Sequence, residues 1–211
     1  MATKHFKGII ALITIKGGAG KTTLAACLGA EFRKQGQEVT MIDADPQQSL
    51  AAWYGDSEPL SNITLIANAE NTAAVIAQQQ PGLVIVDTAG FANKTTIEIA
   101  QIADVVLIPC RSSGIDARQA LQTVALCNEI NKERSSPAKI KVVMTATNRS
   151  AIVRHVRNEM IAAGADVLGC EIGQRTSYPE AELSGSAPCL MGKTAQKAAD
   201  EIQTLSIEIL R

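Results

Sequence analysis

The stretch "ITIKGGAGKTTLAACLG", residues 13–29, decides the fold of this chain. Its central part nearly matches the phosphate-binding loop pattern G-x-x-x-x-G-K-[ST], and the G-K-T that ends the pattern lies at residues 20–22. The first glycine of the pattern would fall at residue 15, but the chain has Ile15 there, followed by a second lysine, Lys16. The stretch therefore predicts a phosphate-binding loop of an unusual kind, with an additional lysine.

The segments around this loop alternate between apolar runs and helical patterns. The predicted strands span 8–15, 38–43, 62–67, 82–89, 104–110, 139–147 and 166–172. The predicted helices span 22–35, 69–80, 115–131, 151–162 and 195–210. This order indicates an α/β fold, a doubly wound, mostly parallel β-sheet flanked by helices, which we expect to form a single domain over residues 1–211. Ligands of such sheets bind at the carboxyl ends of the strands.

The composition is that of an ordinary globular protein. Hydrophobic residues make up 46% of the 211 residues and aromatic residues only 3%, so the core must be aliphatic. The formal net charge is -1, so contact with nucleic acid would require a local basic patch or an oligomer. The five cysteines lie apart without a C-x-x-C pair, which predicts idle thiols in a reducing cytoplasm. No apolar run reaches the roughly 18 residues that a membrane helix needs.

The loop carries the groups that bind a nucleotide phosphate. Three glycines, Gly17, Gly18 and Gly20, allow backbone N–H groups to turn inward around phosphate oxygens. The helix that follows points its positive end at the same anion. Lys21 is placed to reach the outer phosphates, and the hydroxyl of Thr22 is a suitable ligand for Mg²⁺.

Carboxylates lie at or just beyond the ends of two apolar strand runs. "DADPQQS" begins with Asp43 and contains Asp45; one of these carboxylates can hold the water shell of the metal, and one can orient an attacking water. Asp87 follows the apolar residues "LVIV", the pattern of a Walker B carboxylate that contacts Mg²⁺ directly or through water. Gly90 lies just beyond, where a mobile loop can sense the terminal phosphate.

The predicted strand 139–147 is followed by Asn148, which can hydrogen-bond the edge of a nucleobase. The alternative is that Asn148 is a turn or helix-capping residue. The guanine-reading pattern N-K-x-D is absent from the sequence, which favours ATP over GTP.

Five stretches of the chain resemble the motifs of the ParA/MinD family of deviant-Walker ATPases, and they occur in the family's order over nearly the whole chain. They are "KGGAGKTT", "DADPQQS", "VDTAG", "DVVLIPCRSSGIDARQA" and "QRTSYPEAELSGSAP". The chain is most similar to small ParA-type plasmid partition proteins, because about seven residues precede the first strand, too few for a helix-turn-helix. In this family the loop is K-G-G-x-G-K-[ST], without the first glycine. The resemblance identifies Lys16 as the signature lysine, which reaches phosphates bound in the partner subunit of a nucleotide-sandwich dimer. Such a cation in trans acts like an arginine finger.

The resemblance also implies roles for the other site residues. Asp45 is expected to position the hydrolytic water, Asp43 to be a switch carboxylate near Mg²⁺, and Asp87 to be the Walker B aspartate. The expected catalytic residues are Lys16, Lys21 and Asp45. The expected Mg²⁺ ligands, direct or through water, are Thr22, Asp43 and Asp87. The residues expected to bind ATP are Lys16, Gly17, Gly18, Ala19, Gly20, Lys21, Thr22, Thr23 and Asn148.

The function that the resemblance implies is partition or positioning of a cargo. ATP binding is expected to form a homodimer that holds nonspecific nucleoid DNA, and an adaptor of the ParB or ParG type on a plasmid or other cargo then stimulates hydrolysis and releases the dimer. The net charge is close to zero, but a symmetric dimer would double any local basic patch and so strengthen contact with DNA. The residues expected to contact DNA are Arg149, Arg154, Arg157 and Arg175.

The segment 195–210 predicts an amphipathic helix that packs on the domain. Its other face carries Lys197, Asp200, Glu201 and Glu208, which is not the basic face of a membrane-binding helix. We therefore expect no membrane partner.

Two other functions share this type of loop. A small-substrate enzyme, such as an amidation enzyme, a synthetase or an iron–sulfur reductase, would need substrate-binding insertions or cysteines that bridge two subunits; Cys110 is the one cysteine that directly follows a strand. A nucleotide-gated anchor would hydrolyse ATP slowly. The K-G-G-x-G-K loop together with "DADPQ" favours the partition ATPase.

Overall fold

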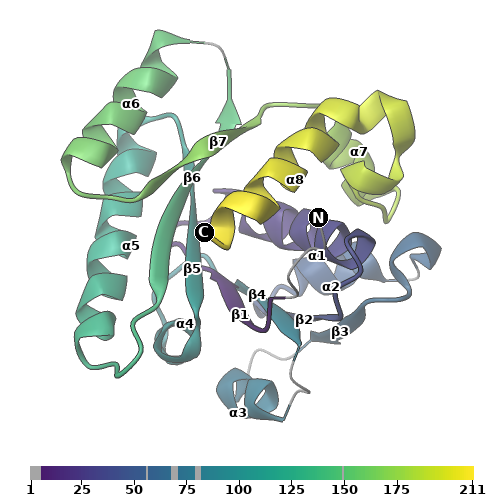
Figure 1. The fold of residues 1–211 in the computed structure, drawn as a ribbon, viewed down its shortest axis with the longest axis horizontal. Helices are drawn as coiled ribbons and strands as arrows, with labels where there is room; N and C mark the ends of the chain where they lie inside the picture. Colours follow the sequence, from purple (N-terminus) through teal and green to yellow (C-terminus); the bar gives the residue numbers. More distant parts are fainter. Residues whose placement is uncertain (1–5, 56, 68–70, 79–81, 149) are drawn as a thin grey trace.

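The computed structural model describes residues 6–55, 57–67, 71–78, 82–148 and 150–211. Within these residues, seven strands form one parallel sheet in the order β3-β2-β4-β1-β5-β6-β7 (Figure 1). The strands are β1 Gly8–Leu12, β2 Val39–Ala44, β3 Thr64–Ala67, β4 Leu83–Thr88, β5 Val105–Arg111, β6 Lys139–Thr147 and β7 Val167–Gly173. The predicted doubly wound α/β fold is confirmed.

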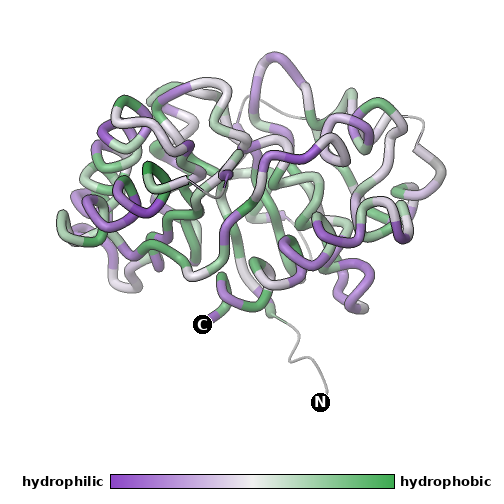
Figure 2. Tube along the Cα trace, turned by 90° about the horizontal axis from the view of Figure 1, so that it is seen from above, coloured by the Kyte–Doolittle hydropathy of each residue, from purple (hydrophilic) through white to green (hydrophobic). Residues whose placement is uncertain are grey.

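Helices cover both faces of the sheet, and each face has its own aliphatic core. One face is covered by α1 Lys21–Lys34, α2 Ser49–Tyr54, α7 Ser177–Leu183 and α8 Gln196–Ile209. The other is covered by α3 Thr72–Ala77, α4 Lys94–Ile102, α5 Gly114–Lys132 and α6 Ala151–Ala162. Figure 2 shows the hydrophobic segments in the middle of the molecule and hydrophilic segments in the outer loops, the pattern of a sheet buried on both sides.

The predicted strands all appear, as do the five predicted helices, with small shifts at their ends. Three helices, α2, α4 and α7, were not predicted. They contain six to nine residues each, so their apolar periodicity is short. For α4 a local indication existed, because Asn93 accepts a hydrogen bond from the backbone N–H of Thr96 and caps the helix.

The helix α8 packs on the sheet through Ala198, Ile202, Leu205 and Ile209, as predicted. Two glutamates of α8 were predicted on the face away from the domain, but they turn toward the edge strand β7. Glu201 accepts a hydrogen bond from the N–H of Gly173 at 3.2 Å, and Glu208 accepts one from the N–H of Cys170 at 3.0 Å. The described part of the chain contains no helix that is long and apolar enough to cross a membrane.

Candidate functional site

The loop between β1 and α1 is the centre of the site. Gly18 and Gly20 have φ angles of 76° and 100°, in the left-handed region that side chains with a Cβ seldom adopt. This conformation joins the strand to the helix over a few residues, and Gly20 directly precedes the first turn of α1. The loop therefore leads into the positive end of a 14-residue helix, which is the geometry of an anion site.

Three threonines hold the backbone of this loop, one beside it in sequence and two from distant parts of the chain. The Thr14 hydroxyl donates to the carbonyl of Lys16 at 2.6 Å, and the Thr145 hydroxyl at the end of β6 donates to the carbonyl of Ala19 at 3.0 Å. The Thr123 hydroxyl on α5 accepts from the N–H of Ile15 at 3.4 Å. Sequence reasoning missed all three; the contacts of Thr123 and Thr145 span 108 and 126 residues, and Thr14 is part of no recognised motif.

Lys21 is buried at the start of α1, with only 6% of the residue exposed. Its ammonium donates to the Thr14 hydroxyl at 3.3 Å. Burial lowers the pKa of Lys21, and the carboxylates of Asp87 and Asp45 partly offset this effect. A buried cation with one neutral hydrogen-bond partner gains stability when an anion such as a phosphate binds beside it.

Thr22 and Asp87 form a candidate Mg²⁺ site. The Thr22 hydroxyl donates to Oδ2 of Asp87 at 2.6 Å, while Oδ1 of Asp87 is buried without a hydrogen-bond partner among the described residues. Burial raises the pKa of Asp87 to about 7, against the hydrogen bond from Thr22 and the charge of Lys21. A buried carboxylate with an unpaired oxygen next to a hydroxyl fits a hard divalent cation, which prefers oxygen ligands.

Asp43 and Asp45 differ in their surroundings. Asp43 is fully buried, and its oxygens accept hydrogen bonds from the N–H groups of Asp45 at 3.1 Å and Ala51 at 2.9 Å. Burial raises the pKa of Asp43, although these N–H groups counteract it. Asp45 is half-buried, and its Oδ1 accepts from the N–H of Gln47 at 2.9 Å. Asp43 thus fixes the turn after β2, and Asp45 is the carboxylate that faces the open cleft.

Lys21, Thr22 and Asp45 line one cleft of about 610 Å³ at the carboxyl end of the sheet. Its walls are Gly17, Gly18, Gly20, Lys21, Thr22, Thr23, Asp45, Pro46, Gln47, Ser49, Gly90, Phe91 and Arg111. The structure thereby brings together residues predicted separately from the first, second and fourth strands. Buried Asp43 and Asp87 lie at the ends of β2 and β4, which are paired in register at these two positions.

The Lys16 side chain lies apart from the cleft walls. Its ammonium donates to Oδ1 of Asp116 on α5 at 2.6 Å, and the Lys16 side chain remains 41% exposed. Burial alone would raise the pKa of Asp116, but hydrogen bonds from Lys16 and Ser113 hold it below its ordinary value. Sequence reasoning missed Asp116 as a partner of Lys16, since 100 residues separate the two.

Gly90 packs directly against the phosphate-binding loop. A Cβ at this position would lie 2.7 Å from Cα and 2.8 Å from N of Gly17, both backbone atoms that cannot yield without moving the loop. We therefore expect Gly90→Ala to weaken ATP binding at least tenfold and to cost about 1–3 kcal/mol of stability. The matched control is Gly114→Ala, where a Cβ meets nothing within 4 Å. Equal ATP affinity for the two variants, measured by calorimetry, would contradict this expectation.

Asp87 should make the stability of the ligand-free protein depend on pH. Its carboxyl has an ordinary pKa of 3.8 and a pKa of about 7 in the folded chain, so the folded state holds the proton more tightly. Stability should therefore be greatest below about pH 4 for this group and fall as pH rises to about 7, by at most about 4 kcal/mol. Asp87→Asn should remove this slope.

The measurement for Asp87 is urea unfolding from pH 5 to pH 8 in the presence of a chelator. The difference in unfolding free energy between wild type and Asp87→Asn isolates this carboxyl from the other groups that titrate. Parallel pH dependences would show that the folded state does not hold a proton on Asp87. Addition of Mg²⁺ should stabilise the wild type at pH 8 and leave the variant unchanged, because the variant lacks the carboxylate charge.

A smaller pocket of about 160 Å³ adjoins the loop on its other side. It is lined by Ala19, Gly20, Thr23, Leu24, Arg111, Thr145, Ala146, Ile172, Gly173, Gln174, Arg175 and Tyr178. One wall residue, Ala146, has a φ angle of 48°, which is uncommon outside glycine and often marks a functional position. Asn148 is exposed and lies outside this pocket, in a neighbouring groove.

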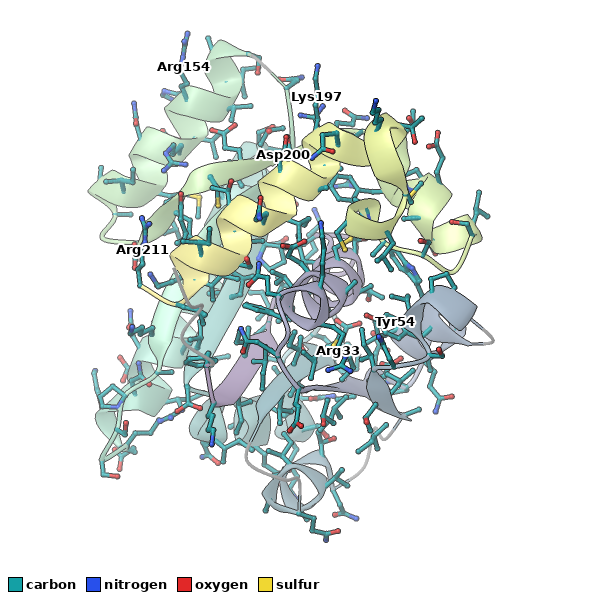
Figure 3. The ribbon with its side chains drawn as sticks, turned by 45° about the vertical axis from the view of Figure 1, so that its right-hand side comes forward. Arg33, Tyr54, Arg154, Lys197, Asp200 and Arg211 are labelled. Carbon is teal, nitrogen blue, oxygen red and sulfur yellow. The ribbon has the colours of Figure 1, made fainter. Side chains whose placement is uncertain are left out.

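That groove, of about 900 Å³, lies between α6, the ends of β6 and β7, and α8. Arg154 on α6 and Lys197 on α8 both line it, and Figure 3 shows them pointing outward at the same end of the molecule. Arg157 donates to the carbonyl of Val167, and Arg175 forms an ion pair with Glu201, so both guanidinium groups already bind within the chain. Arg149 lies outside the described residues.

The other candidate chemistries have few residues to support them. The five cysteines are unpaired, and burial raises the pKa of the Cys110 thiol to about 12, so this thiol is inert at neutral pH. In the described ranges of the chain, no group of three or more His, Cys, Asp or Glu side chains is arranged to hold a metal ion. The Thr22–Asp87 pair relies instead on ligands that a nucleotide and water would complete.

Comparison with known proteins identifies the family. Residues 10–189 match the CobQ/CobB/MinD/ParA nucleotide binding domain family. The chain is 30% identical to Protein ParA of Rhizobium radiobacter over 90% of both chains, and 27% identical to the maintenance of carboxysome distribution protein A of Halothiobacillus neapolitanus over 95% of both. An ATP complex of McdA from Cyanothece shares the fold, with a TM-score of 0.78 over 99% of this chain and 97% of that one, at 19% identity. The chain therefore belongs to the CobQ/CobB/MinD/ParA family and is an ATPase of its ParA/MinD branch.

Proposed function

We propose that this protein is a partition or positioning ATPase of the ParA/McdA type. It binds ATP with Mg²⁺, pairs face to face with a second copy, and in that state holds nonspecific DNA. An adaptor protein on the cargo stimulates hydrolysis, which separates the dimer and releases the DNA. The observation that carries this proposal is the second lysine, Lys16, exposed beside a cleft that already contains Lys21, Thr22 and Asp45.

The phosphates of ATP bind in the cleft of about 610 Å³. Backbone N–H groups of residues 17–20 and the ammonium of Lys21 contact their oxygens. Thr22 and Asp87 provide oxygen ligands for Mg²⁺, with Asp43 behind them. The ion, when bound, offsets the negative charge of the outer phosphates.

Asp45 orients the water that attacks the terminal phosphate. It is the carboxylate of the cleft that is only half-buried, and the N–H of Gln47 fixes one of its oxygens. The Gly90 loop lies against Gly17, so occupancy of the phosphate site and the position of this loop are mechanically linked.

Lys16 acts on the ATP bound by the partner subunit. In the single chain its ammonium is held by Asp116 rather than turned into its own cleft, and 41% of its side chain remains accessible. A second copy facing the carboxyl end of the sheet would place two triphosphates near each other, and a cation donated by each subunit offsets their repulsion. Dimerisation and ATP binding are then thermodynamically linked.

The groove between α6 and α8 is the proposed DNA surface. Of the predicted DNA contacts, Arg154 is exposed and has no ion-pair partner among the described residues, and Lys197 shares the groove with it. Arg157 and Arg175 support the groove wall through Val167 and Glu201. The formal net charge of -1 gives no global attraction to DNA, so the contact depends on a local patch doubled in a dimer.

The experiment is binding to nonspecific duplex DNA, measured by fluorescence anisotropy with ATP and then with ADP at several salt concentrations. We expect binding with ATP that is lost with ADP and weakened by salt. Arg154→Ala and Lys197→Ala should each lower the salt slope by about two per dimer, while Lys94→Ala on α4, which does not line this groove, should not. Absence of binding in both nucleotide states would refute the DNA step, and equal effects of all three substitutions would refute the assigned surface.

A further inference from the structure

Arg111, the last residue of β5, occupies a special place between the two cavities of the site. Its exposed side chain lines both the phosphate cleft and the smaller pocket on the other side of the loop. Only Gly20 and Thr23, at the start of α1, share this property with it. These three residues therefore form the border between the two cavities, and we call this border the passage.

The guanidinium group of Arg111 is not engaged by the rest of the described chain. No hydrogen bond or ion pair of this side chain occurs within the residues that the structure describes. The positive charge of Arg111 helps to lower the pKa of Asp116, but the oxygens of Asp116 accept hydrogen bonds from Lys16 and Ser113 rather than from Arg111. A cation with five N–H donors is thus left available at the passage.

A nucleoside triphosphate that fills both cavities has to cross this border. The cleft of about 610 Å³ contains Lys21 and the glycine loop, which bind outer phosphates. The pocket of about 160 Å³ beyond Thr23 is lined mainly by apolar and amide groups, among them Leu24, Ile172 and Gln174, and of its two arginines Arg175 is already paired with Glu201. The pocket suits a nucleoside rather than a charged group. The innermost phosphate of the ligand would then lie in the passage, beside Arg111.

Resting on the proposed nucleotide site, we propose that Arg111 binds the α-phosphate of the nucleotide held by its own chain. The planar guanidinium can donate two parallel hydrogen bonds to a phosphate, which a lysine cannot do. Three cations then contact one triphosphate: Arg111 binds the inner phosphate, Lys21 binds the outer phosphates, and Lys16 is donated by the partner subunit. Because ADP retains the α-phosphate, Arg111 should strengthen binding of ADP and ATP alike.

The test compares Arg111→Gln with Arg118→Gln, an exposed arginine on α5 that lines neither cavity. Equilibrium binding of ADP and of a non-hydrolysable ATP analogue, both with Mg²⁺, is measured by calorimetry at a protein concentration where ADP-bound chains are single. We expect Arg111→Gln to weaken both ligands about tenfold to a hundredfold, and by similar factors. Arg118→Gln should bind like wild type, and Arg111→Lys should fall between the two.

Each other result has a defined meaning. If Arg111→Gln binds both ligands like Arg118→Gln, the proposal is wrong. If only the ATP analogue is weakened, Arg111 contacts the terminal phosphate or acts in trans, and the α-phosphate assignment is overturned. Lys21→Ala tests the nucleotide site itself. If Lys21→Ala loses nucleotide binding and Arg111→Gln does not, the proposed nucleotide site stands and the role of Arg111 is rejected. Unfolding midpoints of all variants verify the fold, and Arg111→Lys provides the readout if Arg111→Gln is unstable.

Discussion

Replacement of Asp45 by alanine is expected to reduce ATP turnover by a factor of about a hundred to ten thousand, with ATP binding retained. Asp45 is the half-buried carboxylate in the wall of the phosphate cleft, and the N–H of Gln47 holds one of its oxygens in place. A fixed carboxylate that orients the attacking water acts mainly on the transition state, so its loss lowers kcat far more than it lowers affinity. Single-turnover hydrolysis and calorimetric ATP binding, measured on the same preparation, separate the two quantities.

Asp45→Asn is the matched control for this prediction. The amide oxygen can still accept the hydrogen bond from Gln47 and preserve the turn, but it cannot act as a base. Both variants should therefore fail to hydrolyse ATP, and both should remain on DNA when ATP is present. Wild-type turnover in either variant would remove Asp45 from the mechanism. If the wild type itself turns over no faster than the variants, the protein is better described as a nucleotide-gated anchor.

Lys16→Ala is expected to lower turnover of the DNA-bound dimer about a thousandfold, as removal of an arginine finger does. The Lys16 ammonium lies against Asp116 in the single chain, so its removal leaves the phosphate cleft with Lys21 intact. Binding of ATP to the single chain should change little. The measurement is steady-state hydrolysis at saturating ATP and DNA, over a range of protein concentrations.

A mixing experiment decides whether Lys16 acts across the dimer. When Lys16→Ala and Asp45→Ala chains are mixed in equal amounts, each mixed dimer has one site with Asp45 from its own chain and Lys16 from the partner. Turnover should then recover to about one quarter of the wild-type value, because half of the dimers are mixed and one of their two sites is complete. A lysine that serves its own site would give no recovery.

Asp116→Asn is the control for loss of the ion pair itself. It removes the carboxylate partner of Lys16 but leaves the lysine in place. If the effect of Lys16→Ala came from the broken ion pair, Asp116→Asn would reproduce it. We expect instead that Asp116→Asn retains turnover, because the freed ammonium is still available to the partner subunit.

Much of the fold is encoded in local patterns. Parallel strands buried on both faces consist of continuous apolar residues, as in "LVIV" before Asp87, and such runs can be located without knowledge of the partners. The helices α1, α5, α6 and α8 have 12 to 19 residues, enough for their apolar spacing to be recognised. The short helices α2 and α7 depend on the core that they cover, so their own residues predict them poorly.

The site was predictable where its chemistry is local and was not where it depends on contacts across the fold. The glycine loop, Lys21 and Thr22 form one contiguous motif, Asp45 follows β2, and Asp87 ends the apolar run of β4. The residues that support them do not carry such a motif. Thr145 reaches the loop from β6, and Asp116 reaches Lys16 from α5, over separations of 126 and 100 residues. An isolated threonine or aspartate in a helix or strand has many ordinary explanations.

The two glutamates that α8 directs at β7 have a consequence for how copies of this protein can assemble. Glu201 and Glu208 accept hydrogen bonds from the backbone N–H groups of Gly173 and Cys170 in that strand. These N–H groups would otherwise be free to pair with a strand of another molecule. The carboxylate of Glu208 also places negative charge at this border, which disfavours a neighbouring backbone carbonyl, whereas Glu201 is paired with Arg175. Growth of a filament by joining sheets side by side is therefore blocked at β7. Copies of this chain are left with other surfaces for association, such as the helices, the edge strand β3 or the loops around the phosphate cleft.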